Sequence, residues 1–239
     1  MANNRVPKAF NPGLNHTFYF LRTFLYKKVR EHAPDLSGKL LDFGCGSKPY
    51  QSLFTNVTEY VGLDFASEGH SHEKESIDVF YDGKTIPFPD EYFDSVLSSE
   101  VFEHVFNLAE ILPEINRVMK PGAKILITCP FVWPEHEVPV DFARYTVFAL
   151  QHMLQKAGFT IVLTDKSGDF SSAIYQMRMV YFSEHVIPAV PLLGRSKFFR
   201  TSLAPGLYVC MNLWFSFWHK VLPKSKASYM NNIIIAQKK

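Results

Sequence analysis

The chain of 239 residues is poor in cysteine and has no marked excess of charge of either sign. Its cysteines, Cys45, Cys129 and Cys210, lie far apart and form no CxxC pair, which argues against a zinc or redox motif and favours a reducing compartment. The 25 basic and 23 acidic residues give a net charge of +2. Nucleic-acid binding needs a clustered basic excess, so that class of function is disfavoured.

Long apolar runs are also missing. No stretch offers the roughly 20 uninterrupted apolar residues of a spanning helix, and the nearest candidate, 203–218, contains Pro205 and Gly206. The N-terminus has no apolar signal core, so we expect no export. The sequence therefore predicts a cytoplasmic protein. Peripheral attachment to the inner face of the membrane is the less favoured alternative.

Apolar and aromatic residues are abundant enough to fill a large core, at 47% of the chain with 22 Phe and 11 Tyr. From residue 39 onward, short apolar runs alternate with helical patterns, which predicts strand–helix–strand units and a parallel sheet. Helices are expected over 16–32, 107–120 and 146–157, the last with Thr146 as its N-cap. The expected strands are 39–43, 59–64, 77–81, 93–99, 123–129, 159–163 and 231–236.

The alternation stops between 165 and 228, a stretch rich in aromatic residues and interrupted by prolines. The chain is therefore expected to divide into an N-terminal helical cap (1–37), a core (38–164), a helical lid or insertion (165–228) and the core's terminal strand (229–239). Two interpretations of the insertion compete. Its aromatic residues either form a lid over an acceptor pocket, which is favoured, or form an interfacial helix at a bilayer surface.

The strongest motif is Leu40-Leu41-Asp42-Phe43-Gly44-Cys45-Gly46-Ser47, in which an apolar strand ends in an acid and Gly-x-Gly opens a turn. Glycines there let the backbone pass close beneath a ligand. A dinucleotide fingerprint would have a third glycine near position 49, where Pro49 stands, so a pyrophosphate cradle is less favoured.

Two further acids follow the next two strands. Asp64 comes about twenty residues after the glycine turn, where a carboxylate can accept both hydroxyls of a ribose. The alternative is an exposed loop acid. Asp82-Gly83 fits an adenine contact and a simple turn equally well.

Together with 87–94, 100–105 and 119–123, these motifs resemble the class I S-adenosylmethionine-dependent methyltransferases, in particular the small-molecule (type 11) group. The resemblance spans about 39–164. It implies an α/β, Rossmann-like fold with a mostly parallel seven-stranded sheet, helices on both faces and an aromatic-rich helical insertion before the last strand. It also implies S-adenosylmethionine as the cofactor.

The same resemblance assigns a part of the cofactor to each matching position. Asp42, Gly44 and Gly46 would surround the methionine part, Asp64 would hold the ribose, and Phe65 would flank the adenine. Asp82 and Gly83 would face the adenine edge, and Ser99 and Glu100 would lie under the sulfonium. The predicted cofactor residues are thus Asp42, Gly44, Cys45, Gly46, Asp64, Phe65, Asp82, Gly83, Ser99 and Glu100.

A second run, 130–146, follows the fifth strand and is similar to a pattern in methyltransferases associated with bacterial surface-polysaccharide genes. Open α/β folds bind ligands at this edge of the sheet, so Trp133, Arg144 and Tyr145 are predicted to bind the acceptor. A packed loop whose charges pair with one another is the alternative. Because an alcohol acceptor benefits from a base, His136 is the first catalytic candidate and His104 the second.

No spacing of His, Asp and Glu demands a metal, so a metal-independent reaction is expected. The predicted function is O-methylation of a small-molecule or sugar/glycan-intermediate acceptor by in-line transfer. A nicotinamide-dependent dehydrogenase and a non-catalytic binding module are the alternatives. The expected partner is this acceptor and no nucleic acid, and the sequence does not indicate an oligomeric state.

Overall fold

The computed structural model describes residues 5–65, 76–194 and 196–239. The chain forms two compact units. The first comprises Lys28–Asp165 and Asn231–Lys239 with the N-terminal residues up to Val6. The second comprises Pro7–Lys27 and Lys166–Met230, so the beginning of the first helix groups with the insertion.

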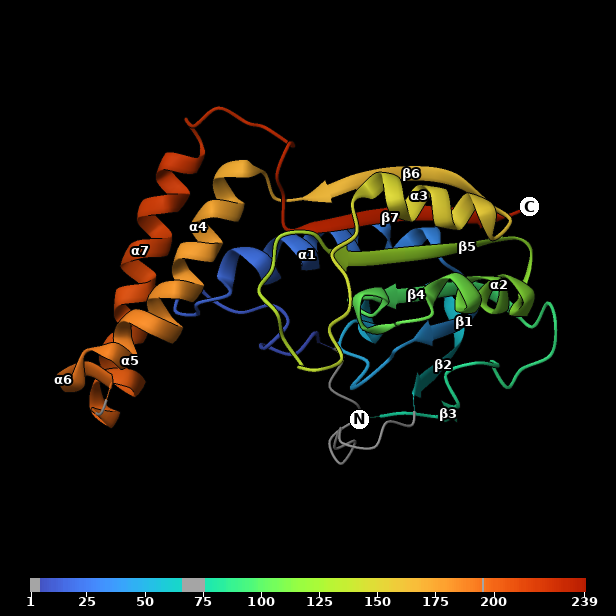
Figure 1. The fold of residues 1–239 in the computed structure, drawn as a ribbon, viewed down its shortest axis with the longest axis horizontal. Coiled ribbons are helices and arrows are strands. Elements are labelled where there is room, and N and C mark those ends of the chain that lie inside the picture. The colour runs from blue at the N-terminus through green and yellow to red at the C-terminus, as the bar shows by residue number, and fades with distance from the viewer. Residues whose placement is uncertain (1–4, 66–75, 195) are drawn as a thin grey trace. The chain divides into compact units, whose positions relative to one another are not determined.

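A seven-stranded sheet forms the centre of the fold, with the strand order β3-β2-β1-β4-β5-β7-β6 (Figure 1). β1 to β5 are parallel to one another, and β7 runs antiparallel to β5. The strand order reverses between β1 and β4, and open α/β sheets bind ligands at such a switch point. The predicted Rossmann-like, mostly parallel sheet is thereby confirmed. The strands are β1 Gly38–Phe43, β2 Val57–Phe65, β3 Val79–Tyr81, β4 Phe93–Ser99, β5 Met119–Pro130, β6 Phe159–Ser167 and β7 Asn231–Lys238.

The central strands are covered on both faces. Leu40 and Leu41 are neighbours in β1 and so point to opposite sides of the sheet, yet both are fully buried. Figure 1 shows α2 (Leu108–Val118) and α3 (Val147–Lys156) on the face turned to the viewer. Strands that are buried on both faces carry continuous apolar runs, which is why these strands could be predicted from the sequence.

One predicted helix end is confirmed and another differs from the prediction. Thr146 caps α3 as predicted, because its Oγ1 accepts a hydrogen bond of 3.2 Å from the Ala149 amide. The helix expected over 107–120 ends earlier, at Val118. Met119 is already extended and pairs with Phe93 of β4, so pairing in the sheet overrides the helical period there.

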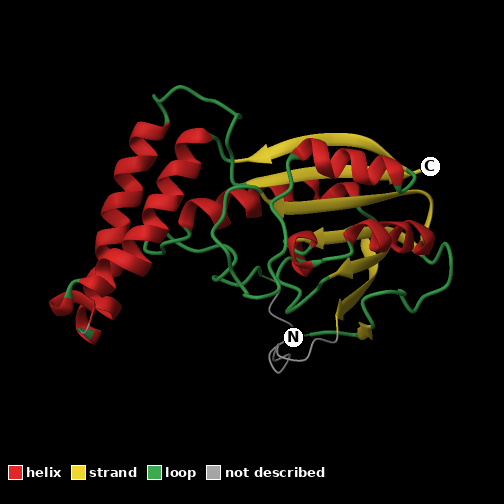
Figure 2. Ribbon diagram, in the orientation of Figure 1, coloured by secondary structure: helices red, strands yellow, loops and turns green. Residues whose placement is uncertain are grey.

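The second unit contains the N-terminal part of α1 (Tyr19–His32), the longer helices α4 (Phe170–Tyr181) and α7 (Ala204–His219), and the short α5 (Ile187–Ala189) and α6 (Pro191–Gly194). α4 and α7 run side by side (Figure 2), and the rings of Tyr175 and Phe215 stack between them at 4.0 Å. The predicted helical insertion is thus confirmed. Among the described residues, no helix is long and apolar enough to cross a bilayer.

Candidate cofactor and acceptor site

A cavity of about 490 Å³ opens where β1, β2, β3 and β4 end, on the carboxyl side of the parallel strands. Its volume lies in the range of small-molecule sites. Asp42, Cys45 and Ser99 flank it in the chain without being part of its wall. The predicted cofactor residues in its wall are Gly44, Gly46, Asp64, Phe65, Asp82, Gly83 and Glu100.

The glycine turn after β1 forms the cavity floor next to β2. Gly44 has a φ of +74°, and a Cβ added there would lie 2.4 Å from Cγ2 of Val101. Only glycine satisfies both the left-handed conformation and the close approach. The amide of Gly46 donates to Asp64 Oδ2 at 2.8 Å, which ties this turn to the tip of β2.

Asp64 is held by two backbone donors, since the amide of Phe65 also donates to its Oδ1 at 2.8 Å. A carboxylate at the end of this strand is the group that can accept hydrogen bonds from both hydroxyls of a ribose. Asp64 is therefore a hydrogen-bond acceptor in the cavity wall, as the predicted contact with the ribose hydroxyls requires. The role itself stays a prediction.

Replacing Asp64 by alanine tests that role. We expect S-adenosylhomocysteine to bind about 1.5–3 kcal/mol more weakly, the scale of a hydrogen bond to a charged group. Titration calorimetry on the folded variant measures it, with Asp90→Ala as the control, because Asp90 pairs with Arg117 and is not in the cavity wall. An unchanged affinity would remove Asp64 from the site.

Asp42 is buried, with 3% of its surface exposed, and accepts a 2.6 Å hydrogen bond from the Tyr60 hydroxyl of β2. Burial raises the pKa of Asp42 to about 7. Sequence reasoning missed Tyr60. Its signal was available, because a tyrosine on a strand beside the core needs a partner for its hydroxyl.

The turn after β3 forms another part of the wall. Asp82 Oδ1 accepts from the amides of Lys84 and Thr85, both at 2.9 Å, and these bonds hold the pKa of Asp82 below its usual value. A Cβ on Gly83 would lie 2.8 Å from the Phe65 ring. Asp82 therefore stabilises the turn and also lies in the cavity wall, so both interpretations of this residue remain compatible with the structure.

Glu100 follows β4 with a φ of +58°, in the left-handed region that non-glycine residues rarely adopt. Its Oε1 accepts from Thr128 Oγ1 at 2.7 Å, and its Oε2 accepts from Asn231 Nδ2 at 2.6 Å. Ser99 contacts the same threonine, with Oγ 2.9 Å from Oγ1 of Thr128. Residues with an unfavourable backbone conformation, such as Glu100, cluster at functional sites. Here the side chains of Thr128 in β5 and Asn231 in β7 hold the Glu100 carboxylate in place.

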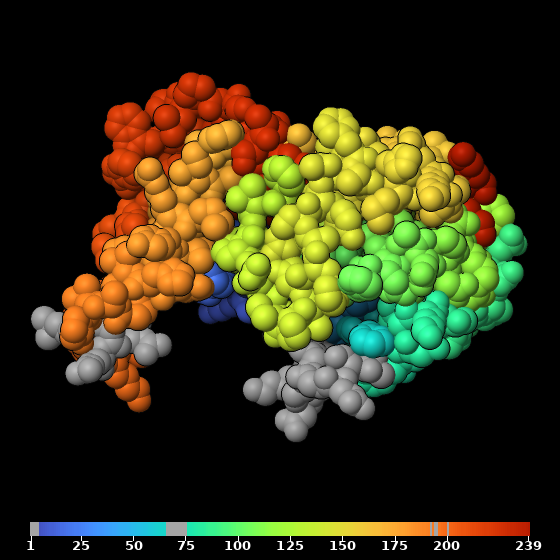
Figure 3. Space-filling view, in the orientation of Figure 1, coloured from blue at the N-terminus to red at the C-terminus, as the bar shows by residue number. Residues whose placement is uncertain are grey.

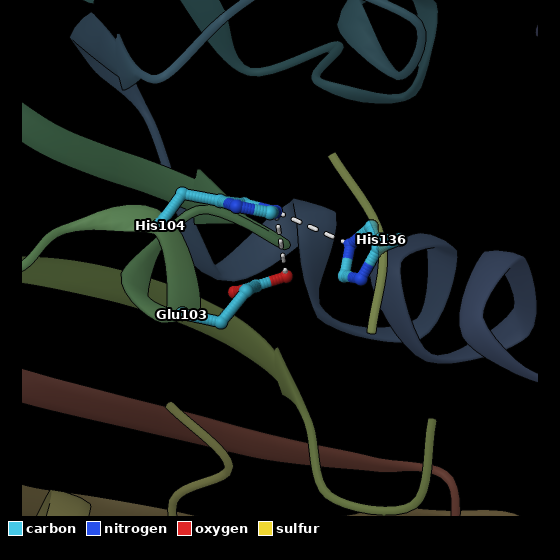
Figure 4. A group of neighbouring side chains, drawn as sticks. All are labelled: Glu103, His104 and His136. Atoms are coloured by element: carbon cyan, nitrogen blue, oxygen red, sulfur yellow. Dashed lines mark hydrogen bonds and ion pairs between the residues drawn. The ribbon is translucent and has the colours of Figure 1, made fainter. Parts of the chain in front are cut away.

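Two histidines, His104 and His136, lie side by side, as Figure 4 shows. His104 is in the cavity wall, whereas His136 is not and lies in the loop after β5. Their Nε2 atoms are 3.2 Å apart. His104 Nδ1 lies 2.8 Å from the Val140 carbonyl oxygen, which can only accept, so in the neutral ring Nδ1 carries the proton and Nε2 has the lone pair. Burial lowers the pKa of His136, which favours its neutral form at pH 7.

Glu103 completes this cluster, with Oε1 3.7 Å from His104 Nε2. One ligand atom from each of Glu103, His104 and His136 lies within 4.8 Å of the others, and these are residue types that bind Zn²⁺. The three could hold a metal ion. Burial raises the pKa of Glu103 well above its usual value, which opposes the charged form that a metal needs. No ligand spacing indicated this cluster, because His136 lies in a loop far from Glu103 and His104 in the sequence. Metal independence stays a prediction.

Arg144 holds the loop 131–146, which forms the yellow-green surface in Figure 3. It donates to both carboxylate oxygens of Asp141 at 2.6 Å and to the carbonyls of Trp133 and Pro134. The guanidinium lowers the pKa of Asp141 to about 2. Neither Trp133, Arg144 nor Tyr145 is in the wall of the cavity described here, and their predicted role in acceptor binding stays untested.

The cavity rim beside His104 carries apolar rings together with the carboxylate of Glu137, whose Oε2 lies 3.9 Å from His104 Nε2. Phe106 is 82% exposed and packs edge-to-face on Phe142 at 5.4 Å, and both rings form part of the wall with Val105 and Val140. Sequence reasoning did not single out these residues, because they come from two loops without a periodic pattern. They add a wide apolar surface to the cavity wall.

Comparison with known proteins supports the motif assignment. Residues 41–127 match the model of a methyltransferase domain family, type 11. A probable S-adenosylmethionine-dependent methyltransferase of Mycolicibacterium smegmatis is 26% identical over 68% of this chain and 66% of its own length. The mitochondrial ubiquinone biosynthesis O-methyltransferase of Rattus norvegicus is 36% identical over 46% of this chain and 36% of its own length.

The chain thus spans between about a third and just under two thirds of these curated relatives. The fold is also that of a crystal structure described as a putative sarcosine dimethylglycine methyltransferase from Galdieria sulphuraria. The TM-score is 0.57 at 14% identity, over 92% of this chain and 86% of that one. The matched motifs, the strand order and the cavity at the switch point all indicate the same family of folds. Residues 41–127 thus match a methyltransferase domain of the type 11 family, the fold is that of the class I S-adenosylmethionine-dependent methyltransferases, and S-adenosylmethionine is the cofactor that this match indicates.

Proposed function

We propose that the protein transfers a methyl group from S-adenosylmethionine to a hydroxyl oxygen of a small-molecule or sugar/glycan-intermediate acceptor. The observation that carries this proposal is a single cavity that contains residues of both predicted sites. Gly44, Gly46 and Asp64 of the predicted cofactor site lie in its wall, and so does His104, a predicted catalytic residue. A donor and an acceptor held in one cavity can react in line without solvent between them.

The cofactor side would bind by the predicted contacts. Asp64 would hold the ribose, Phe65 and Gly83 would enclose the adenine, and Glu100 would lie near the sulfonium. When bound, S-adenosylmethionine supplies an activated methyl group, so the chain's own residues have to orient and desolvate the reactants. Gly44 and Glu100 both have a left-handed backbone, and at Gly44 the lack of a side chain would let the main chain pass close to the cofactor.

On the acceptor side, the histidine pair would take up the proton. The new C–O bond forms as the S–CH3 bond breaks, and the hydroxyl proton passes to Nε2 of His104. Because Nε2 of His136 lies 3.2 Å away, the proton can be shared with the second ring and passed to solvent. The carbonyl of Val140 fixes the orientation of His104.

An oxygen acceptor is supported by the rat relative, which is named an O-methyltransferase. An acceptor with an apolar part or a ring is supported by Phe106 and Phe142, whose faces border the cavity. A sugar ring presents such an apolar face. The acceptor's polar atoms would then be directed inward, toward His104.

Two measurements test the proposal. In titration calorimetry we expect S-adenosylhomocysteine to bind and NAD not to bind, and the reverse result would indicate a dehydrogenase. Incubation with methyl-labelled cofactor and the host's metabolite and glycan-intermediate fractions should then transfer label to an acceptor. Tight S-adenosylhomocysteine binding with no transfer to any fraction would indicate a non-catalytic binding module.

A further inference from the structure

Helix α7 is divided lengthwise into a buried and an exposed face. Its inner face packs in the core of the second unit, where Phe215 stacks on Tyr175 and Asn212 is fully buried. Its outer face is almost entirely apolar and ends in Val221 just after the helix. The exposed residues of this outer face are Leu207, Cys210, Leu213, Trp214, Phe217 and Trp218.

These side chains form one continuous stripe. Positions 207, 210, 214 and 217 follow each other at three- and four-residue steps, which places them on one side of α7 over about 15 Å, and Val221 follows just beyond the helix. Trp214 and Phe217 are each 63% exposed, and Val221 is 66% exposed. Single exposed apolar residues are ordinary, but a contiguous stripe without a charge marks an interaction surface.

The charged residues that flank the stripe in the sequence have one sign, although Asp169 of the preceding segment pairs with His219 at the end of α7 and with Lys224 after it. Between His185 and Met230 the sequence contains no Asp and no Glu. The basic residues in that range lie on both sides of α7 in the sequence: Arg195, Lys197 and Arg200 before it, and Lys220, Lys224 and Lys226 after it. Lys197 and Lys220 are exposed. An apolar stripe with a basic segment at each end is complementary to a surface that is apolar inside and anionic outside.

We propose that the outer face of α7 docks on the surface of an anionic lipid bilayer. The stripe would lie in the plane of the interface, with Trp214 and Trp218 at the depth of the headgroups and the flanking lysines against lipid phosphate. α7 cannot span the bilayer, because it has 16 residues and its inner face belongs to the core of the second unit. A symmetric dimer through this face would oppose two basic segments, which repel each other.

This docking differs from the favoured sequence-based interpretation, in which these aromatic residues form a lid. The exposure of Trp214, Phe217 and Val221, together with the one-signed charge, makes the bilayer the better partner. The proposal goes beyond methyl transfer and does not depend on it. Neither a methyl donor nor an acceptor is needed to test it.

Cys210 offers a probe at the centre of the stripe, since the other cysteines, Cys45 and Cys129, are buried. We expect an environment-sensitive fluorophore on Cys210 to shift to shorter wavelength with vesicles of phosphatidylcholine and phosphatidylglycerol, and to become protected from iodide quenching. Vesicles of phosphatidylcholine alone should give a much smaller shift. High salt should reduce binding to the anionic vesicles.

Variants separate the apolar from the charged contribution in co-sedimentation of the unlabelled full chain. Trp214→Ser with Phe217→Ser, and separately Lys197→Glu with Lys220→Glu, should each lower the affinity for anionic vesicles at least about tenfold. Phe148→Ser is the matched control, because Phe148 is 75% exposed on α3 and lies outside the stripe. Circular dichroism confirms that each variant is folded.

Several results would overturn the proposal. One is the absence of vesicle binding by the unaltered chain. Another is binding that the stripe variants leave unchanged. A dimer that sedimentation detects and that Trp214→Ser with Phe217→Ser dissociates, without vesicle binding, would assign the stripe to a second copy of the chain. Because all these measurements are made without cofactor, their outcome is independent of whether methyl transfer is observed.

Discussion

Replacing His136 by alanine is expected to lower turnover by roughly 100-fold or more while leaving S-adenosylhomocysteine affinity near that of the unaltered protein. His136 contacts His104, which is in the cavity wall, and is itself outside that wall. Its loss should therefore affect proton transfer without removing a cofactor contact. Steady-state kinetics with the identified acceptor and calorimetry with S-adenosylhomocysteine measure the two effects separately.

His104→Ala should give a loss of the same order, and the double variant should be little worse than either single one. Groups that act as a unit lose most of their effect when either member is removed. His152→Ala is the control, because His152 is exposed on α3 away from the cavity. Unaltered turnover across neutral pH in both single variants would mean that no base is needed.

A metal would change this interpretation, because Glu103, His104 and His136 could also act as ligands. Metal analysis of the purified protein distinguishes the two roles. A stoichiometric divalent ion, lost in Glu103→Gln together with turnover, would contradict the predicted metal independence. With no ion bound, Glu103→Gln should retain far more turnover than His136→Ala, because the carboxyl group only borders the histidine pair.

The fold was largely predictable because its signals are local. The turn after β1 combines an apolar run, an acid and Gly-x-Gly within a few residues, and the required φ of +74° at Gly44 explains why glycine stands there. β4 was predicted with its observed bounds, Phe93–Ser99, since both of its ends carry a change in polarity. The end of α2 was less predictable, because Met119 pairs with Phe93 of β4 and so belongs to the sheet instead of the helix.

The contacts of the site were less predictable because they join distant parts of the chain. Asn231 of β7 donates to Glu100, 131 positions away, and the loop residue His136 meets His104 across 32 positions. Neither distance follows from a helical or strand period. The one available signal for the first contact was the Asn231-Asn232 pair at the start of an otherwise apolar terminal strand. Polar side chains in such a strand need partners when they are buried.

Asp42→Asn is expected to stabilise the cofactor-free protein at pH 8 by about 2–4 kcal/mol and to flatten its stability between about pH 4 and 7. Burial raises the pKa of Asp42 from 3.8 to about 7, so in this range the folded chain binds more protons than the unfolded chain. The contribution of the neutral carboxyl is complete below about pH 4 and is lost as the pH rises through 7. Asparagine is neutral throughout and keeps an acceptor for the Tyr60 hydroxyl. Urea unfolding at several pH values measures this, with Asp90→Asn as the exposed control.

Binding should show the opposite effect of the same substitution. If Asp42 neutralises the ammonium group of the methionine part, as the family resemblance implies, the bound state favours the carboxylate and a proton leaves on binding. The affinity for S-adenosylhomocysteine should then fall as the pH drops below about 7, the pKa of Asp42 in the cofactor-free protein. Asp42→Asn should weaken binding at pH 8 and remove this pH dependence. Calorimetry in buffers of different ionisation enthalpy counts the released protons. An asparagine variant that is stabilised at pH 8 but binds S-adenosylhomocysteine as before would make Asp42 a structural residue and leave the ammonium group to another acceptor.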